Sequence, residues 1–565
     1  MTDPELGSAI SASGFNQPTG IAFIGTGDYL VIEKGSGMVK RVQDGQVAAD
    51  PVLDLAVNFF DERGLLGIEM HPDFANNNYV YLYWTARDDS GAPDTLLGED
   101  TDVPTEVPDL GNRVDRFTWD GSTLTWDQEI VRLRSNTLES DTSGRVRGNH
   151  DAGPLEFGSD GMLYVQNGDQ NLRGQLQNIA EGAAPDDASF SGVILRLNDD
   201  GSLPDDNPFF AQGAEIGGEA GENIQAVWAY GIRNSFGLQF HPETGDLWQT
   251  ENGDDSWDEI NRFTAGVNSG WIQVMGPPER FEEYRQIETE SADGLDNPDF
   301  PPDQLAATVE EATGRLFQLE GSAYAAPVFS WRYPPAATAL EFVLGDELGA
   351  SSGNSIFVGT VLTDSLLRYP LDDDGSGLAL EGGLADNVDD NAAKGDVGES
   401  ADYVVGTGFG VITDIVLGLD GLLYVSSVSN GAVYVVGPAD ALPAPAPSGS
   451  AAPSGSAAPS GSLGASPSGS AGAGQVLIQT DTGTANQFVP AEAQAATGAQ
   501  VSLTFENIAT VPHNLTFGPP INQATSVVVP PGSSETLEFT APAAGDYQFV
   551  CTLHPGMEGT LTVTP

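Results

Sequence analysis

A segment rich in small residues and proline divides this chain into two parts that cannot share a core. Residues from about Ala441 to Gly474 are almost entirely Pro, Ala, Ser and Gly, and they repeat the motif Ala-Ala-Pro-Ser-Gly-Ser. This composition buries too little apolar surface to fold and is typical of a flexible linker. A coil of about 34 residues has a root-mean-square span of about 30 Å. We therefore predict domains at residues 1–440 and 475–565, joined by a linker at 441–474.

The charge balance excludes one class of function. The chain of 565 residues carries 82 Asp and Glu against 21 Lys and Arg. Nucleic-acid binding depends on basic side chains that displace counterions from phosphates, so a nucleic-acid partner is excluded. The acidity suits a protein that stays soluble outside the cell or in high salt. No stretch is long and apolar enough to predict a membrane-spanning helix.

Short strand patterns recur through residues 1–440. Each unit pairs an alternating apolar strand with a turn of Gly, Asp or Asn and a second strand. Because matching helices are absent, we predict an all-β fold that closes radially as a six-bladed β-propeller. A large β-sandwich or two stacked barrels is the alternative, and only Pro302–Phe317 is predicted to be helical, as an insertion. The six units are Gly27–Ile32, Asn78–Tyr83, Gly161–Val165, Gly245–Trp248, Asn354–Val358 and Gly421–Val425.

The residues after the linker form a second pattern of strands. Apolar and polar residues alternate in runs such as Val501–Phe505 and Thr560–Val563. This alternation predicts a small all-β domain, a Greek-key barrel or sandwich.

Four side chains of this last domain form a candidate metal site. Cys551, His554 and Met557 lie within seven residues, and His513 lies about forty residues upstream. The chain contains a single cysteine, so no intrachain disulfide can form and the thiol is free, reactive or metal-bound. Two imidazoles, a thiolate and a weak axial thioether are the ligand set of blue copper centres. Zinc is the rival metal, but a thioether ligand does not suit it.

The spacing Cys-x-x-His-x-x-Met and the strand Tyr547–Val550 that precedes it resemble the cupredoxins, and amicyanin among them. This resemblance covers the whole domain. It implies a type 1 copper that carries one electron at a time, with His554 at the exposed edge of the site.

Glycine-rich polar segments of the first domain carry a second group of candidate residues. They contain His150, Asp169 and Arg233, and Gly253 and Asp254 follow in a third segment. Polar strand ends of this kind line the central pocket of a propeller. The segments are 148–153, 168–170, 230–238 and 250–261.

Together with Gly64–Gly67 and His71–Phe74, these segments resemble the soluble glucose/sorbosone dehydrogenases, quinoproteins that use pyrroloquinoline quinone (PQQ) and calcium. The resemblance runs through most of residues 15–436. It implies that His150 is the general base that takes a proton from a sugar hydroxyl. Asp169 would orient His150, and Arg233 would stabilise negative charge at the quinone oxygen.

The resemblance also implies the cofactor sites. The backbone at Gly253 and Asp254 would hold the cofactor's calcium, and Asp258 and Glu259 would hold a second, structural calcium. The residues expected to bind the cofactor are Glu62, Gln175, Asn234, Gly253, Asp254 and Trp331.

Several positions depart from the family pattern. A Lys and an Arg-x-Arg pair hold the cofactor's carboxylates in the family, and Leu362, Val411 and Thr413 align with them here. At two positions where the family has glutamine, this chain has Phe236 and Glu62. PQQ carries three carboxylates, and burying them without matching cations costs free energy. The candidate substitutes are Arg173, Arg332 and Arg368.

Two functions fit these features. The first is an oxidoreductase whose propeller oxidises a sugar or related alcohol and whose tethered copper domain passes the electrons to an external redox partner. The second is a propeller that binds a carbohydrate or protein without catalysis, joined to a copper electron carrier. A nitrous-oxide-reductase-like protein is excluded, because its binuclear copper centre needs two cysteines. Both resemblances imply an extracytoplasmic, for example periplasmic, location, although residues 1–4 do not begin a secretory signal.

Overall fold

The chain divides by its contacts into two units, Met1–Pro447 and Ser448–Pro565, here called the propeller unit and the sandwich unit. No described helix is long and apolar enough to cross a membrane. Most of the linker lies outside the described residues, so its predicted limits stay a prediction. The computed structural model describes residues 1–59, 62–86, 111–135, 149–170, 188–289, 300, 302–349, 352–439, 441–442, 475–480, 487–508, 513, 515–517, 521, 525, 529, 534–551 and 557–564.

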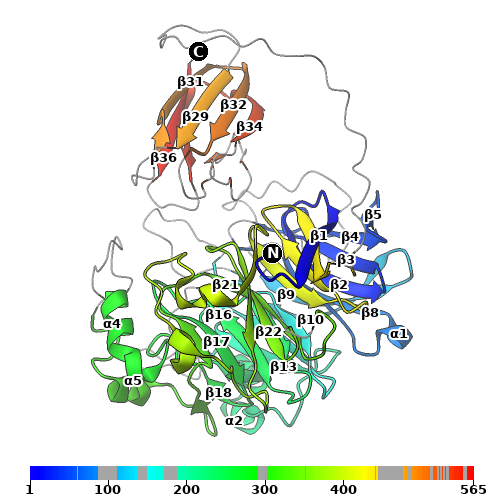
Figure 1. Cartoon of the computed structure of the whole chain (residues 1–565), viewed down its shortest axis with the longest axis vertical. Coiled ribbons are helices and arrows are strands. Elements are labelled where there is room, and N and C mark those ends of the chain that lie inside the picture. Colours follow the sequence, from blue (N-terminus) through cyan, green and yellow to red (C-terminus); the bar gives the residue numbers. More distant parts are fainter. Residues whose placement is uncertain are drawn as a thin grey trace. The chain divides into compact units, whose positions relative to one another are not determined.

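Six sheets follow one another along the propeller unit, which confirms the predicted six-bladed propeller (Figure 1). The first two sheets contain β2 (Pro18–Gly25), β3 (Asp28–Glu33), β4 (Met38–Gln43), β5 (Gln46–Val47) and β6 (Leu53–Asp54), and then β7 (Leu65–Met70), β8 (Tyr79–Thr85), β9 (Asn112–Trp119) and β10 (Leu124–Leu133). The third contains β11 (Leu155–Phe157), β12 (Leu163–Asn167), β13 (Val193–Leu197), β14 (Val227–Tyr230), β18 (Val267–Asn268) and β19 (Ala323–Tyr324).

The remaining sheets complete the ring. The fourth contains β15 (Gly237–Phe240), β16 (Leu247–Glu251), β17 (Asp258–Phe263), β20 (Phe329–Trp331) and β24 (Val388–Asp389), and the fifth β21 (Ala337–Val343), β22 (Ser355–Thr360), β23 (Ser365–Pro370) and β25 (Val404–Thr407). The sixth joins β26 (Ile412–Leu417), β27 (Leu423–Ser427) and β28 (Ala432–Pro438) to the N-terminal β1 (Leu6–Ser13). Figure 1 shows β1 in blue beside these yellow strands.

The core of the propeller unit lies between neighbouring sheets. Middle strands such as β8 and β22 are buried along their length, because each sheet packs against a sheet on both of its faces. This explains why their sequences read as almost continuous apolar runs.

The helices differ from the sequence expectation. The predicted helix at 302–317 contains α5 (Val309–Arg315), but it is not the only one. Since the others are short and rich in Gly and Glu, their apolar periodicity is too weak to stand out. The structure also contains α1 (Phe74–Asn77), α2 (Phe210–Ile216), α3 (Gly218–Ala226) and α4 (Phe281–Thr289), with the 3₁₀ turns η2 (Pro278–Arg280), η3 (Gly382–Asp386) and η4 (Gly398–Tyr403).

The described residues of the sandwich unit form two four-stranded sheets that do not close into one barrel. This confirms the sandwich form of the predicted domain. One sheet has the order β30 (Phe488–Val489), β29 (Gln475–Thr480), β32 (Gln500–Glu506) and β34 (Ser534–Thr540). The other has the order β31 (Glu492–Ala496), β36 (Glu558–Thr564), β35 (Gly545–Val550) and β33 (Thr516–Phe517).

Inner strands of the propeller unit contact one another in a closed cycle, β2, β7, β11, β15, β21 and β26. Five of them carry a polar side chain at a similar position: Glu69, Glu156, Gln239, Glu341 and Asp414. The Gln239 amide nitrogen can donate to Glu156 Oε2 at 2.9 Å. Burial raises the pKa of Glu341 and of Asp414 to about 7, and it raises the pKa of Glu156 strongly. We call these five residues the channel ring.

The channel ring should make the propeller unit less stable at alkaline pH. Burial, and then the charge of Asp414, raise the pKa of Glu69 from 4.5 to about 8. A carboxyl whose folded pKa is raised stabilises the fold at low pH, and this contribution is lost as the pH rises towards 8. The Glu69 side chain is only partly buried, so solvent weakens this effect. We expect Glu69→Gln to raise the free energy of unfolding by about 1 kcal/mol at pH 8 and to leave it unchanged at pH 4.

Urea unfolding followed by tryptophan fluorescence measures this difference, since all 8 tryptophans lie in the propeller unit. Glu320→Gln, on the exposed surface, is the matched control. An equal effect of Glu69→Gln at both pH values would contradict the prediction.

Candidate functional site

One end of the propeller unit gathers the residues singled out in the sequence. His150 precedes β11, Asp169 follows β12, and Arg233 follows β14. Because these strands are antiparallel neighbours, the start of β11 and the ends of β12 and β14 meet at the same edge of the sheet. The segment around Gly253 follows β16 in the next sheet. The structure therefore brings the predicted catalytic residues together.

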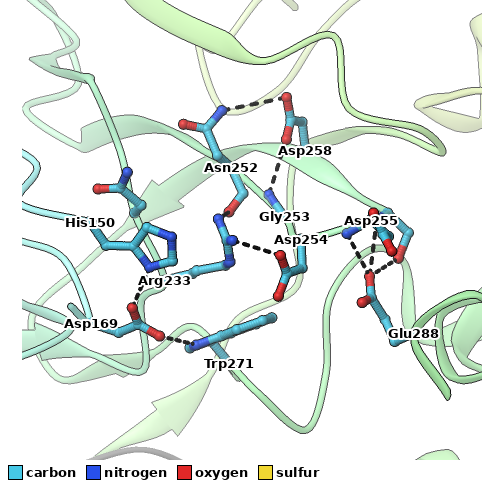
Figure 2. A network of polar contacts seen from close by, with 12 residues as sticks. His150, Asp169, Arg233, Asn252, Gly253, Asp254, Asp255, Asp258, Trp271 and Glu288 are labelled. Carbon is cyan, nitrogen blue, oxygen red and sulfur yellow. Dashed lines mark hydrogen bonds and ion pairs between the residues drawn. The ribbon is translucent and has the colours of Figure 1, made fainter. Parts of the chain in front are cut away.

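His150 and Asp169 form a direct pair (Figure 2). His150 Nδ1 lies 2.5 Å from Asp169 Oδ1, and Asp169 Oδ2 accepts a hydrogen bond from Trp271 Nε1 at 2.7 Å. Asp169 is fully buried and His150 is 7% exposed. Since a carboxylate only accepts, the proton of neutral His150 is on Nδ1, which leaves Nε2 able to accept a proton.

The backbone around His150 is held tightly. His150 has a φ of 59°, in the left-handed region, and its amide donates to Glu62 Oε2 at 2.7 Å. Asn234 Nδ2 donates to the same oxygen at 3.2 Å. A Cβ at Gly168 would lie 2.2 Å from the His150 carbonyl oxygen, so only glycine fits there. The predicted residues Glu62 and Asn234 therefore support the conformation of the candidate base.

Arg233 forms the second half of the site. Its guanidinium donates to the Asn252 carbonyl at 3.1 Å and to Asp254 Oδ1 at 2.9 Å. It also lies over the ring of Trp271, 5.4 Å from the ring centroid. Burial opposes the charge, but the carboxylates of Asp254 and Asp169 raise the pKa of Arg233 above its ordinary value. Trp271 thus contacts both the His150–Asp169 pair and Arg233.

Several buried polar atoms of this site lack a hydrogen-bond partner among the described residues: Arg233 Nε, Asn234 Oδ1, Asn252 Oδ1 and Asp151 Oδ2. Buried polar groups without partners are costly, and a bound ligand can satisfy them. Burial raises the pKa of Asp151 to about 8. Arg233 Nε is a donor and the other three atoms are acceptor oxygens, so a ligand that satisfied all of them, as PQQ could, would offer a negative group to Arg233 and donor groups to the oxygens.

The predicted calcium residues are engaged by the protein itself. Asp258 accepts from the amides of Gly253 at 3.0 Å and Ala337 at 2.8 Å, and Glu259 accepts from the amide of Gly276 and from Asn261. Burial raises the pKa of Asp258 to about 6 and that of Glu259 to about 7. The part of the chain that the structure describes has no group of three or more His, Cys, Asp or Glu able to hold a metal. Both calcium assignments stay predictions.

The predicted cofactor residue Trp331 lies opposite Asp258 where β17 pairs with β20. Trp331 is 1% exposed and packs in a core cluster against Phe329 and Tyr369. Gln175 lies outside the described residues. Their role in cofactor binding stays a prediction.

The positions that align with the family's cationic anchors carry no charge. Leu362 is half exposed, and Thr413 Oγ1 donates to the Pro18 carbonyl at 2.9 Å. Of the candidate substitutes, Arg368 pairs with Asp3 at 2.7 Å and Arg332 lies 3.3 Å from Glu283. Arg173 lies outside the described residues. The sequence analysis did not consider Trp271 or Lys394, because neither belongs to a motif of the family resemblance.

The sandwich unit brings three of the four predicted copper ligands into its core. His513 is 1% exposed, Cys551 4% and Met557 1%, and Cys551 and Met557 belong to one apolar cluster. The Cys551 amide donates to the Met557 carbonyl at 3.0 Å. His554 lies outside the described residues.

The distance between two of these ligands suits a bound metal. Cys551 Sγ lies 3.8 Å from His513 Nδ1. A tetrahedral metal with bonds of about 2.3 Å to sulfur and about 2.0 Å to nitrogen would separate them by about 3.5 Å. A thiolate, an imidazole and a thioether together fit copper.

The propeller unit thus holds a buried network of His150, Asp169 and Arg233, and the sandwich unit holds Cys551, His513 and Met557 in its core. The glucose/sorbosone dehydrogenase family model matches residues 15–308, just over half of the chain, and a cupredoxin-like domain model matches residues 463–563. The chain therefore belongs to the glucose/sorbosone dehydrogenase family and carries a cupredoxin-like domain.

Individual relatives agree with this family. The chain is 31% identical over 278 residues to quinoprotein glucose dehydrogenase B of Acinetobacter calcoaceticus, across 47% of this chain and 52% of that protein. It is 26% identical over 334 residues to aldose sugar dehydrogenase YliI of Escherichia coli K12, across 59% of this chain and 72% of that protein. The chain thus spans only about half the length of the first of these relatives.

A solved structure supports the propeller fold. The apo-form of soluble aldose sugar dehydrogenase from Escherichia coli covers 77% of this chain and 99% of its own, with a TM-score of 0.52 and 22% identity.

Proposed function

We propose that the propeller unit oxidises a sugar or related alcohol and that the sandwich unit carries the electrons away one at a time through a type 1 copper. The observation that best supports this proposal is the buried His150–Asp169 pair beside Arg233. A general base and a fixed positive charge on one site are the groups that alcohol oxidation requires.

Each residue of the site has a separate role in the proposed reaction. His150 Nε2 accepts the proton of the substrate hydroxyl, and Asp169 stabilises the imidazolium that forms. Arg233 stabilises negative charge on the electron acceptor, since the neighbouring carboxylate of Asp254 keeps the buried guanidinium positively charged. PQQ, when bound, would supply a two-electron acceptor for the hydride of the carbon that bears this hydroxyl. Trp271 holds Asp169 and Arg233 in place and excludes water from them.

The sandwich unit supplies the one-electron carrier. His513, Cys551, His554 and Met557 would hold the copper, and the linker would keep it near the propeller unit at an effective concentration of order mM. The sandwich unit has no Lys or Arg, so it offers an acidic surface to an external redox partner. We infer an extracytoplasmic location from the family membership.

One titration tests the proposal. The copper-loaded full chain is mixed with PQQ and calcium, and its blue absorption is followed after an aldose is added. We expect bleaching that requires both PQQ and the sugar. A chain that turns blue but neither takes up PQQ nor bleaches would contradict the proposal. That result would favour a non-catalytic carbohydrate- or protein-binding propeller.

A further inference from the structure

Lys394 lies at the candidate active site although it belongs to none of the segments that predicted it. It sits in the loop between β24 and η4. Asn391, 1% exposed, fixes this loop by accepting from the Tyr333 amide at 2.8 Å and donating to the Tyr333 carbonyl at 2.7 Å. The Ala392 amide donates to Asp396 at 3.0 Å. The loop therefore presents Lys394 from a well-anchored base.

The ammonium of Lys394 reaches the segment that also binds Arg233. Lys394 Nζ donates to the Asp254 carbonyl at 3.1 Å and forms an ion pair with Asp255. Asp254 Oδ1 accepts from Arg233 at 2.9 Å. The Asp254–Asp255 turn, labelled in Figure 2, thus lies between two positive charges. Lys394 is 37% exposed and Asp255 15%, so the ion pair is partly exposed to solvent.

The loop of Lys394 packs on the position where the family pattern has a lysine. A Cβ on Gly395 would lie 3.3 Å from the Leu362 carbonyl oxygen and 3.5 Å from Leu362 Cβ. Leu362 itself is apolar and half exposed. The chain neighbour of Lys394 therefore lies beside Leu362, and this loop brings a positive charge to the Asp254–Asp255 turn.

The other described candidates for a cationic anchor already bind other partners. Arg368 binds both Asp3 and Ser352, and Arg332 lies near Glu283 with its guanidinium over the ring of Tyr333. Lys394 is the described candidate that shares its partner turn with Arg233.

We propose that Lys394 is the cationic anchor for a carboxylate of PQQ and that it exchanges Asp255 for this carboxylate when the cofactor binds. The proposal rests on the proposed function. The exchange costs little free energy, because a partly exposed ion pair of lysine and aspartate contributes little to stability. The lysine ammonium also lies on a flexible side chain and reorients readily. Asp255 then acts as a competitor for the same charge.

Two substitutions with opposite expected effects test this role. PQQ is titrated into the full chain in the presence of calcium, and its dissociation constant is measured by calorimetry, without sugar or turnover. We expect Lys394→Met to weaken PQQ binding about tenfold or more. Asp255→Asn should strengthen binding, because it releases Lys394. Lys40→Met is the matched control, since Lys40 pairs with Glu33 at 3.0 Å in the first sheet, and it should leave the dissociation constant unchanged.

The outcomes separate this inference from the proposed function. Wild-type affinity in Lys394→Met would overturn the anchor role and leave the proposed function standing. Weaker binding in both Lys394→Met and Asp255→Asn would also overturn it, because the pair would then act only by holding the turn. A wild-type chain that takes up no PQQ would overturn both the anchor role and the quinone chemistry of the proposed function.

Discussion

Replacing His150 with alanine is expected to lower the rate of sugar oxidation by about 10²- to 10⁴-fold, the contribution of a positioned general base. The side chain is the only described imidazole at the site, and its Nδ1 is held by Asp169 at 2.5 Å. Without it, the hydroxyl proton has no acceptor as the hydride leaves. The measurement is sugar-dependent reduction of an external dye by the chain loaded with PQQ and calcium.

The controls distinguish lost chemistry from lost structure. His71 is a turn residue whose Nδ1 accepts from the Asp73 amide at 2.9 Å, so His71→Ala should retain the rate. Asp169→Asn should lower the rate while keeping PQQ uptake, because an amide no longer stabilises the imidazolium. If His150→Ala oxidised sugar at the wild-type rate, another residue would be the base.

Replacing Cys551 with serine is expected to abolish the blue absorption completely and to stop the transfer of electrons to the sandwich unit. Type 1 copper requires the thiolate, and a serine hydroxyl does not ionise near neutral pH. Sugar oxidation measured with an external dye should continue at the wild-type rate, because the reaction takes place in the propeller unit. Absorption spectra of the copper-loaded variant and dye reduction measure the two effects separately.

Met557→Leu is the matched control for this copper prediction. Met557 is 1% exposed in the same apolar cluster, and its thioether is the proposed weak axial ligand. Leucine fills a similar volume, so the variant should remain blue with an altered potential. A blue Cys551→Ser protein would disprove the ligand assignment, and loss of dye-linked oxidation would show that the two units do not act separately.

The sheets of the propeller unit could be read from the sequence because each depends on local signals. The predicted strands Gly161–Val165 and Gly421–Val425 overlap β12 and β27, where apolar residues follow a glycine turn. The pairing of β1 with β28 was not predicted, since it joins residues such as Leu6 and Pro438 that no local pattern connects.

The sequence predicted only those residues of the candidate site that belong to a motif of the family resemblance. His150, Asp169 and Arg233 lie in segments that the family resemblance identifies, and the structure brings them together. Lys394 reaches the same site from the loop after β24, and Trp271 reaches it from the segment after β18. Their roles depend on contacts between distant loops, which spacing along the chain does not encode.

The pairing of β1 with β28 also sets the order in which the protein can be completed. The sixth sheet needs Leu6 and Pro438 at once, so during synthesis the ring stays open until nearly the whole propeller unit has left the ribosome. Contacts between such distant residues form slowly. Until they form, the edge of β1 that pairs with β28 stays unpaired and prone to aggregation. The carboxylate of Asp414, which accepts from the Ile21 amide at 2.8 Å, likewise joins the last sheet to the first. The nascent chain therefore leaves β1 without its partner strand until β28 has been synthesised.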